Sequence, residues 1–291
     1  MDSSVYARLK KLQIVSKKIS RSALIGDYAS AFKGVGLEFD QLRAYEPGDD
    51  VRSIDWKASA RTNETMVKTF IQERDRTVLV AIDTSASMFY GSGESLKYDF
   101  ACTVAGAIGS IAVNSHDKFG ALLFSTAVDV WIPPARGFGH LARVVDAACQ
   151  VTKGAAGTSF DALFAFLMKL KNKRGVVVFV VSDWLDAKAA QLASFSAVAR
   201  QYDLIAISVS DRAEVDFPAF GLLPLRDIES GKTVVFDTTT IKKRAFCSII
   251  AKQRSSILKK MGVSHLNLEV GDSWVAALAR FFRERTRRQI G

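Results

Sequence analysis

Residues 78–87 read VLVAIDTSAS, an apolar, β-branched run that ends in Asp83 and is followed by two serines, Ser85 and Ser87. A run of this kind is typical of a strand buried on both faces of a parallel sheet. Ligands of open α/β sheets bind at the carboxyl ends of the strands. This stretch therefore places a carboxylate and two hydroxyls at the functional edge of the predicted sheet.

The pattern of strand and helix repeats through the centre of the chain. Three further β-branched runs predict strands, and segments with helical periodicity separate them. The predicted strands lie at 78–82, 119–124, 176–181 and 204–209, and the predicted helices at about 94–114, 139–151, 159–171 and 187–200. Alternation of this kind predicts an α/β fold with a doubly wound, mostly parallel sheet and helices on both of its faces.

Segments of different character flank this predicted core. Residues 1–76 contain a basic helical stretch, a segment rich in glycine and charge, and an extended run at 66–72. We expect them to form an N-terminal extension that packs on the α/β domain, and residues 77–291 to form that domain with a C-terminal extension. The C-terminal extension is predicted to contain a hairpin turning at 229–231, a basic helix near 240–260, a strand near 263–269 and a final helix from about 272.

Composition excludes several classes of protein. With 291 residues, 48% of them hydrophobic and 24% charged, the chain has enough apolar material for a core and is not expected to be disordered. No stretch reaches the ~20 apolar residues of a membrane span, and the first residues lack the apolar segment of a secretory signal. Three scattered cysteines argue against a disulfide scaffold or a zinc site. We therefore expect a soluble, cytoplasmic protein.

Two further oxygen-bearing side chains, Thr158 and Asp183, are predicted to lie at the same edge of the sheet as Asp83. Asp183 follows the predicted strand at 176–181, and Thr158 stands at the start of a predicted helix between the two strand ends. With Asp83, Ser85 and Ser87 they form a set of hard oxygen donors without nitrogen or sulfur, which favours Mg²⁺, or Mn²⁺, over zinc and copper. Because hydroxyls are neutral ligands, such an ion would keep positive charge and accept an acidic oxygen from outside.

Each of these residues also has a purely structural explanation. Ser85 or Ser87 could cap a helix, and Thr158 with Asp161 fits a capping box. Asp183 could be a loop residue that accepts hydrogen bonds from the backbone. The occurrence of all five residues in order, each at the end of a predicted element, favours the metal site.

The five residues resemble the metal-ion-dependent adhesion site of von Willebrand factor A domains. The match consists of DxSxS at Asp83, Ser85 and Ser87, followed by Thr158 and Asp183. The resemblance implies that the hydroxyls contact the ion and that the aspartates act directly or through water. The sequence departs from many relatives at Trp184, where they have glycine. We expect this bulky residue to narrow access to the ion or to form part of a docking rim.

A second motif lies in the N-terminal extension, where residues 43–56 read RAYEPGDDVRSIDW and residues 58–61 read ASAR. The prolyl-glycyl pair indicates a turn, and side chains of both charges surround it. They form either an ion-paired structural clasp or a partner-binding surface, and we expect Trp56 to anchor the segment to the core. The candidate partner-binding residues here are Arg43, Asp49, Asp50, Arg52, Asp55, Trp56 and Arg61.

This second motif is similar to the sequence signature of bacterial domain-of-unknown-function family fifty-eight. Members of that family combine the signature with an A-type domain. They are commonly encoded beside AAA+ ATPases of the MoxR type, which are thought to act as chaperones in protein maturation. The resemblance therefore implies a MoxR-type ATPase, or a client protein with an exposed acidic residue, as the partner.

We expect a binding module rather than an enzyme. No nucleotide site is expected, since the SGKT at 230–233 has Arg226 where a phosphate-binding loop needs glycine. A magnesium-dependent phosphotransferase or phosphatase-like enzyme is an alternative, but acceptor chemistry at Asp83 would call for a second aspartate where Ser85 stands. A basic scaffold for nucleic acid or membrane is another, suggested by the basic segments 1–25 and 240–260. Aromatic residues do not alternate with these basic residues as base stacking would require, so nucleic acid is not expected as a partner. A membrane surface is not expected as a partner either.

Overall fold

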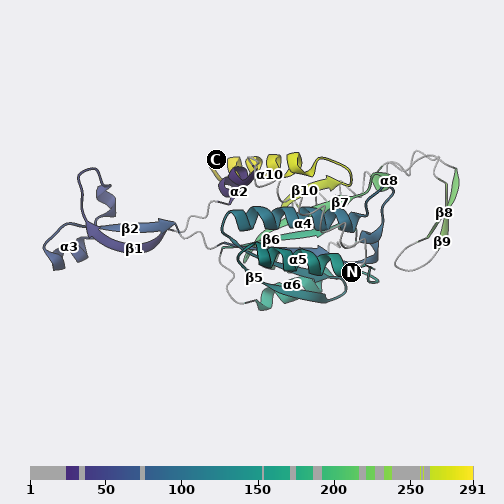
Figure 1. The fold of residues 1–291 in the computed structure, drawn as a ribbon, viewed down its shortest axis with the longest axis horizontal. Helices are drawn as coiled ribbons and strands as arrows, with labels where there is room; N and C mark the ends of the chain where they lie inside the picture. The colour runs from purple at the N-terminus through teal and green to yellow at the C-terminus, as the bar shows by residue number, and fades with distance from the viewer. Residues whose placement is uncertain are drawn as a thin grey trace. The chain divides into compact units, whose positions relative to one another are not determined.

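The computed structural model describes residues 24–32, 37–72, 76–152, 154–170, 175–185, 192–215, 221–226, 233–237, 256, 258 and 263–290. These residues fall into two compact units (Figure 1). The first unit contains the described residues up to Phe32 and from Arg76 onward, and the second contains those between Lys33 and Asp75.

The first unit is built on a six-stranded sheet with the order β10-β7-β6-β3-β4-β5. Five strands are parallel and β5 runs antiparallel to β4. The predicted doubly wound, mostly parallel sheet is confirmed. The strands are β3 (Thr77–Asp83), β4 (Lys118–Phe124), β5 (Val128–Ala135), β6 (Val176–Ser182), β7 (Asp203–Ser210) and β10 (Ser264–Glu269).

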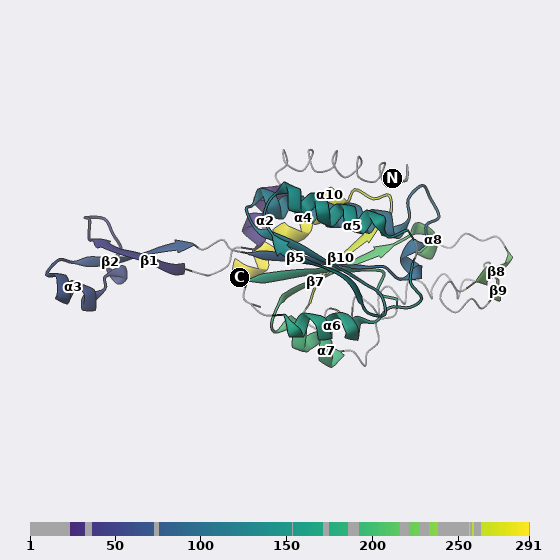
Figure 2. The ribbon, with the colours of Figure 1, turned by 60° about the horizontal axis from the view of Figure 1, so that its bottom comes forward.

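Helices cover both faces of this sheet (Figure 2). The side chains of β3 alternate between two cores, with Val78, Val80 and Ile82 on one side and Leu79 and Ala81 on the other. One face is covered by α2 (Leu24–Ala31), α4 (Lys97–Asn114), α5 (Phe138–Gln150) and α10 (Trp274–Ile290), and the other by α6 (Phe160–Lys169) and α7 (Leu192–Ala199).

Helix α2 belongs to the same unit as the six-stranded sheet; sequence analysis placed it in an N-terminal extension, residues 1–76, that packs on the α/β domain. Buried Tyr28 packs edge-on against Phe282 of α10, and its hydroxyl donates to Asp117 at 2.8 Å. Phe32 packs against the same phenylalanine. The apolar face of α2 is therefore buried against α10.

The second unit is a small antiparallel pair, β1 (Leu37–Ala44) with β2 (Met66–Gln72). The connection between the two strands carries a short 3₁₀ helix, η1 (Val51–Ser53), and helix α3 (Trp56–Thr62). The extended run predicted at 66–72 is thus a strand. The family-like motif at 43–61 forms the end of β1 and the connection to β2.

The C-terminal part also follows the predicted order. Helix α8 (Arg212–Val215) comes after β7, and strands β8 (Leu222–Arg226) and β9 (Thr233–Asp237) form the expected antiparallel hairpin. The predicted turn at 229–231 and most of the predicted basic helix at 240–260 lie outside the described residues. Within the described part of the chain, every helix is too short or too polar to cross a bilayer.

Helix α4 lies unusually close to the sheet because small residues line its contact. A Cβ atom added at Gly109 would stand 2.6 Å from both Phe119 of β4 and Leu141 of α5. At Gly26 in α2 the same atom would meet nothing within 4 Å. The two helical glycines therefore offer a matched test of this packing.

We expect Gly109→Ala to lower the free energy of unfolding by about 1–3 kcal/mol, since the added methyl overpacks the core. Gly26→Ala should raise it by about 0.5–1 kcal/mol, because alanine favours the helix and finds open space. Urea unfolding of both variants beside the wild type measures the two changes. Changes of the same sign would contradict the close approach of α4 to the sheet.

Candidate metal centre

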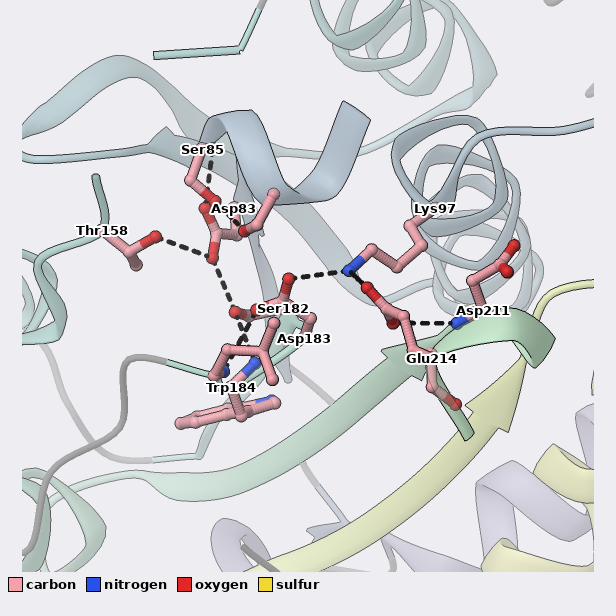
Figure 3. Close-up of polar contacts among 12 residues, drawn as sticks. Asp83, Ser85, Lys97, Thr158, Ser182, Asp183, Trp184, Asp211 and Glu214 are labelled. Atoms are coloured by element: carbon pink, nitrogen blue, oxygen red, sulfur yellow. Dashed lines mark hydrogen bonds and ion pairs between the residues drawn. The ribbon is translucent and has the colours of Figure 1, made fainter. Parts of the chain in front are cut away.

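Asp83 is the centre of the polar cluster at the carboxyl end of β3, between β4 and β6 (Figure 3). Its side chain is fully buried. Oδ1 accepts a hydrogen bond from the backbone nitrogen of Ser85 at 2.8 Å, and Oδ2 accepts one from the Ser182 hydroxyl at 2.6 Å. The Thr158 hydroxyl lies 3.5 Å from Oδ2. Three elements that are distant in sequence therefore converge on one carboxylate.

Ser85 and Ser87 lie together in the turn that follows β3. Ser85 stands at the N-cap position of the 3₁₀ helix η2 (Ala86–Phe89), but its side chain makes no capping hydrogen bond. Its Oγ lies 3.0 Å from the Oγ of Ser87 instead. The capping explanation for Ser85 is therefore wrong, and the two hydroxyls form a pair.

Backbone contacts hold the Thr158 loop against this turn. Ser85 and Ala155 form a parallel bridge, and the backbone nitrogen of Ala86 donates to the carbonyl of Ala155 at 2.7 Å. A Cβ atom at Gly154 would stand only 2.4 Å from the Ala86 Cα, so this close approach requires glycine. The loop thereby delivers Thr158 to the end of β3.

The structure excludes the capping box that would have explained Thr158 without a ligand. The N-cap of α6 is the next residue, Ser159, whose side chain accepts from the backbone nitrogen of Ala162 at 3.2 Å. Thr158 precedes the cap, and its hydroxyl points toward Asp83 (Figure 3).

Asp183 follows directly after β6, whose Ser182 lies level with the end of β3. Its Oδ1 accepts from the backbone nitrogen of Leu185 at 3.1 Å, as the structural explanation for this residue proposed. Its Oδ2 accepts from the Lys97 ammonium at 2.9 Å. Asp183 is therefore held by a cation that the sequence analysis did not identify.

Trp184 does not form a docking rim, and this expectation is corrected. Its side chain has 0% exposure and stacks on Phe160 with ring centroids 4.6 Å apart. The indole nitrogen donates to the carbonyl of Ile207 at 3.1 Å. The backbone of Trp184 is left-handed, with φ of +58°, which turns the indole into the core beneath the site.

Lys97, Glu214 and Asp211 form a charged chain beside Asp183. The ammonium of Lys97, the first residue of α4, is fully buried and also donates to Glu214 Oε1 at 2.6 Å. Glu214 Oε2 in turn accepts from the backbone nitrogen of Asp211, whose carboxylate accepts from the backbone and hydroxyl of Ser92. One signal in the sequence could have identified Asp211. It follows a strand and a serine, as Asp183 does.

Burial sets the protonation of these groups. It raises the pKa of Asp83 to about 6, with a smaller contribution from the nearby charge of Asp183, while hydrogen bonds from Ser182 and Ser85 oppose the rise. Burial lowers the pKa of Lys97, but attraction to Asp183 and Glu214 outweighs it and leaves that pKa above the usual value. Lys97 is therefore charged, and Asp83 is not balanced by any cation of its own among the contacts described.

The donor set fits a hard divalent cation. Magnesium takes six oxygens at about 2.0–2.1 Å in an octahedron, so neighbouring ligand oxygens lie about 3 Å apart. The separations of 3.0 Å between the serine hydroxyls and 3.5 Å between Thr158 and Asp83 are of that order. Among the described residues no three His, Cys, Asp or Glu side chains gather into a metal-binding group. The fit to magnesium therefore depends on the hydroxyls.

Most of the candidate charged residues in the second unit form ion pairs or cap helices within that unit. Arg43 makes two hydrogen bonds to Asp49, at 2.8 and 2.6 Å, and this pair lowers the pKa of the carboxyl. Asp55 caps α3 through the backbone nitrogens of Lys57 and Ala58 and pairs with Lys68 at 3.1 Å. Asp50 caps η1. These contacts agree with the structural clasp.

The remaining candidates of this motif are exposed. Trp56, at the first position of α3, has an exposed fraction of 69%. The sequence analysis expected Trp56 to anchor the segment to the core, and its exposure shows that it does not. Arg52 and Arg61 are also exposed.

Comparison with known proteins identifies the family. A family described as "Protein of unknown function DUF58" matches residues 41–256. The chain belongs to this family. This DUF58 protein is 28% identical to uncharacterized proteins of Mycobacterium bovis and Mycobacterium tuberculosis, with 98% of this chain and 91% of those proteins covered. The family resemblance predicted from the second motif is thus confirmed.

Two solved structures from Bacteroides species are also similar to this DUF58 protein. One is the conserved hypothetical protein BatB from Bacteroides thetaiotaomicron, at 14% identity and a TM-score of 0.47, with 73% of this chain and 99% of that chain covered. The other is an aerotolerance-related membrane protein from Bacteroides fragilis, at 16% identity and a TM-score of 0.45, with 72% and 99% covered.

The buried carboxylate predicts a specific pH dependence of stability in the presence of a chelator. An unfolded aspartate titrates near pH 3.9, so the folded protein binds more protons than the unfolded chain between that pH and about 6. The stability from protonated Asp83 is therefore present at pH 4 and lost as the pH rises through about 6.

Asp83→Asn removes this titration. Relative to wild type, its free energy of unfolding should rise by about 2 kcal/mol between pH 4 and pH 7. Urea unfolding of both proteins in EDTA across this range measures the difference. A difference that stays constant with pH would contradict the burial of a titrating carboxylate at this position.

Proposed function

We propose that this DUF58 protein is a metal-dependent protein-binding module that docks an acidic side chain of a partner at the end of β3. The observation that carries the proposal is the convergence of Thr158 and the serine pair on the buried carboxylate of Asp83. Capping does not account for the hydroxyls of Thr158 and Ser85, as shown above. A role as ligands to a hard cation does.

Asp83, Ser85, Ser87 and Thr158 would hold Mg²⁺, or Mn²⁺, and Asp183 would act through water because Lys97 and Leu185 already donate to its oxygens. When bound, the ion supplies a Lewis-acidic position for an oxygen ligand from outside. The protein residues contribute one nearby carboxylate and three neutral hydroxyls, so positive charge remains for an acidic partner. The site is thus suited to recognition rather than to bond cleavage.

The partner class follows from the family resemblance. We propose that the docked acidic side chain belongs to a MoxR-type AAA+ ATPase, or to a client protein on which that ATPase acts. ATP-driven work in protein maturation would then come from the ATPase, while this chain would act as a cytoplasmic adaptor. Contacts from the exposed Trp56, Arg52 and Arg61 could add to the docking.

One observation bears on the alternative of a phosphotransferase. Acceptor chemistry at Asp83 calls for a nearby lysine, and Lys97 lies beside the site. Its ammonium is buried between Asp183 and Glu214, so binding a phosphate would require breaking both ion pairs. Ser85 also occupies the position where such an enzyme would need its second aspartate. We therefore favour the binding module.

The metal site is tested by removing one hydroxyl. We expect Thr158→Val to weaken magnesium binding by about tenfold, since one oxygen ligand is lost while the shape of the side chain is kept. Thr286→Val is a matched control, because the Thr286 hydroxyl only donates to the Phe282 carbonyl within α10. Isothermal titration calorimetry with magnesium measures both. Equal affinities in the two variants would contradict the assignment of Thr158.

Docking is tested with a purified MoxR-type ATPase from the same organism. We expect a complex in magnesium that is lost in EDTA and weakened by Thr158→Val, since the docked carboxylate needs the ion. Binding measured by surface plasmon resonance at several salt concentrations separates this from a basic scaffold, whose affinity falls steeply with salt but does not respond to chelator. A complex indifferent to both EDTA and the substitution would refute metal-dependent docking.

A further inference from the structure

The charged groups beside Asp183 include a cation that the proposed metal site does not use. Lys97 is fully buried, and both of its ion-pair partners are carboxylates, Asp183 at 2.9 Å and Glu214 at 2.6 Å. A buried ammonium is costly unless it is paired, so its position must be compensated by these two groups. The pairing places a permanent positive charge directly on one of the five predicted metal-site residues.

We propose that Lys97 is the built-in counter-ion of this site, holding Asp183 in place when no metal is bound and opposing the binding of a divalent cation. The inference rests on the proposed metal site and concerns the regulation of its affinity. Lys97 is a positioning residue, since it acts on the ion through Asp183 rather than as a ligand.

Charge complementarity supports this role. The acidic side chains around Lys97 are those of Asp83, Asp183, Glu214 and Asp211, and the Lys97 ammonium offsets one of these negative charges. Without Lys97 the same site would attract a cation more strongly, because the positive charge next to Asp183 Oδ2 would be gone.

Glu214 connects the ion pairs of Lys97 to the short helix α8. Glu214 lies in the short helix α8, and its second oxygen accepts from the backbone of Asp211 at the start of that helix. Asp211 in turn binds Ser92, in the loop after η2. A change in the Lys97 ion pairs would therefore alter the hydrogen bonds of the β7–α8 connection and of the loop that leads into α4.

The test compares three substitutions. Lys97→Met should raise magnesium affinity by about tenfold, since it removes one nearby positive charge. Glu214→Gln should lower it by about threefold, because Lys97 then acts on Asp183 alone and a negative charge is lost. Lys169→Met removes an equal positive charge at the exposed far end of α6 and should leave the affinity unchanged. Isothermal titration calorimetry with magnesium chloride measures all three.

Thermal unfolding separates this role from a merely structural one. In EDTA, Lys97→Met should lower the melting temperature by on the order of 10 °C, because two carboxylates lose their buried partner. Saturating magnesium should raise the melting temperature of Lys97→Met by more degrees than it raises that of the wild type. A purely structural lysine would lower the melting temperature equally in both conditions.

The outcomes distinguish the two proposals. If wild type binds magnesium and Lys97→Met has the same affinity and the same magnesium-induced rise, the counter-ion role is refuted and the metal site stands. If Lys97→Met does not fold in EDTA, a fall in affinity in Glu214→Gln supports the role and an unchanged affinity refutes it. If wild type itself shows no response to magnesium, the metal site is refuted and this inference with it.

Discussion

The burial of the Asp83 carboxylate is the constraint on which the rest of the site depends. The sheet places this residue at the end of β3, between the parallel strands β4 and β6, and its side chain is fully buried. A carboxylate in such a place needs hydrogen-bond donors or a cation. The turn after β3 and the end of β6 supply donors, and burial still raises its pKa to about 6. Even with these donors, the ionised form of Asp83 is therefore less favoured than it would be in water.

The two aspartates of the site, Asp83 and Asp183, have different kinds of hydrogen-bond donors. Asp183 has an ammonium at 2.9 Å, whereas the contacts described for Asp83 come from hydroxyls and a backbone amide. A cation arriving at this edge would therefore gain most by lying near Asp83, where the serine pair and Thr158 already converge. In the metal site that we propose, this asymmetry would make Asp83 the direct ligand and Asp183 the more distant one.

The sequence predicted the sheet well because its buried strands are continuous apolar runs. Strand β5 was missed, since it is an edge strand whose side chains are partly exposed and which contains Pro133 and Pro134. The five oxygen donors could be found because each follows a strand or precedes a helix. Lys97 could not, because nothing local distinguishes a lysine at a helix start that will be buried from one that will be solvated.

Two other errors have the same physical origin, since both concern where an aromatic side chain points. Trp184 was expected at the surface and is buried, because its left-handed backbone turns the ring toward Phe160. Trp56 was expected in a core and is exposed. In the second unit, Arg43 pairs with Asp49 and Lys68 pairs with Asp55, so these charges have partners within the unit itself. Trp56, Arg52 and Arg61 are exposed in the same motif.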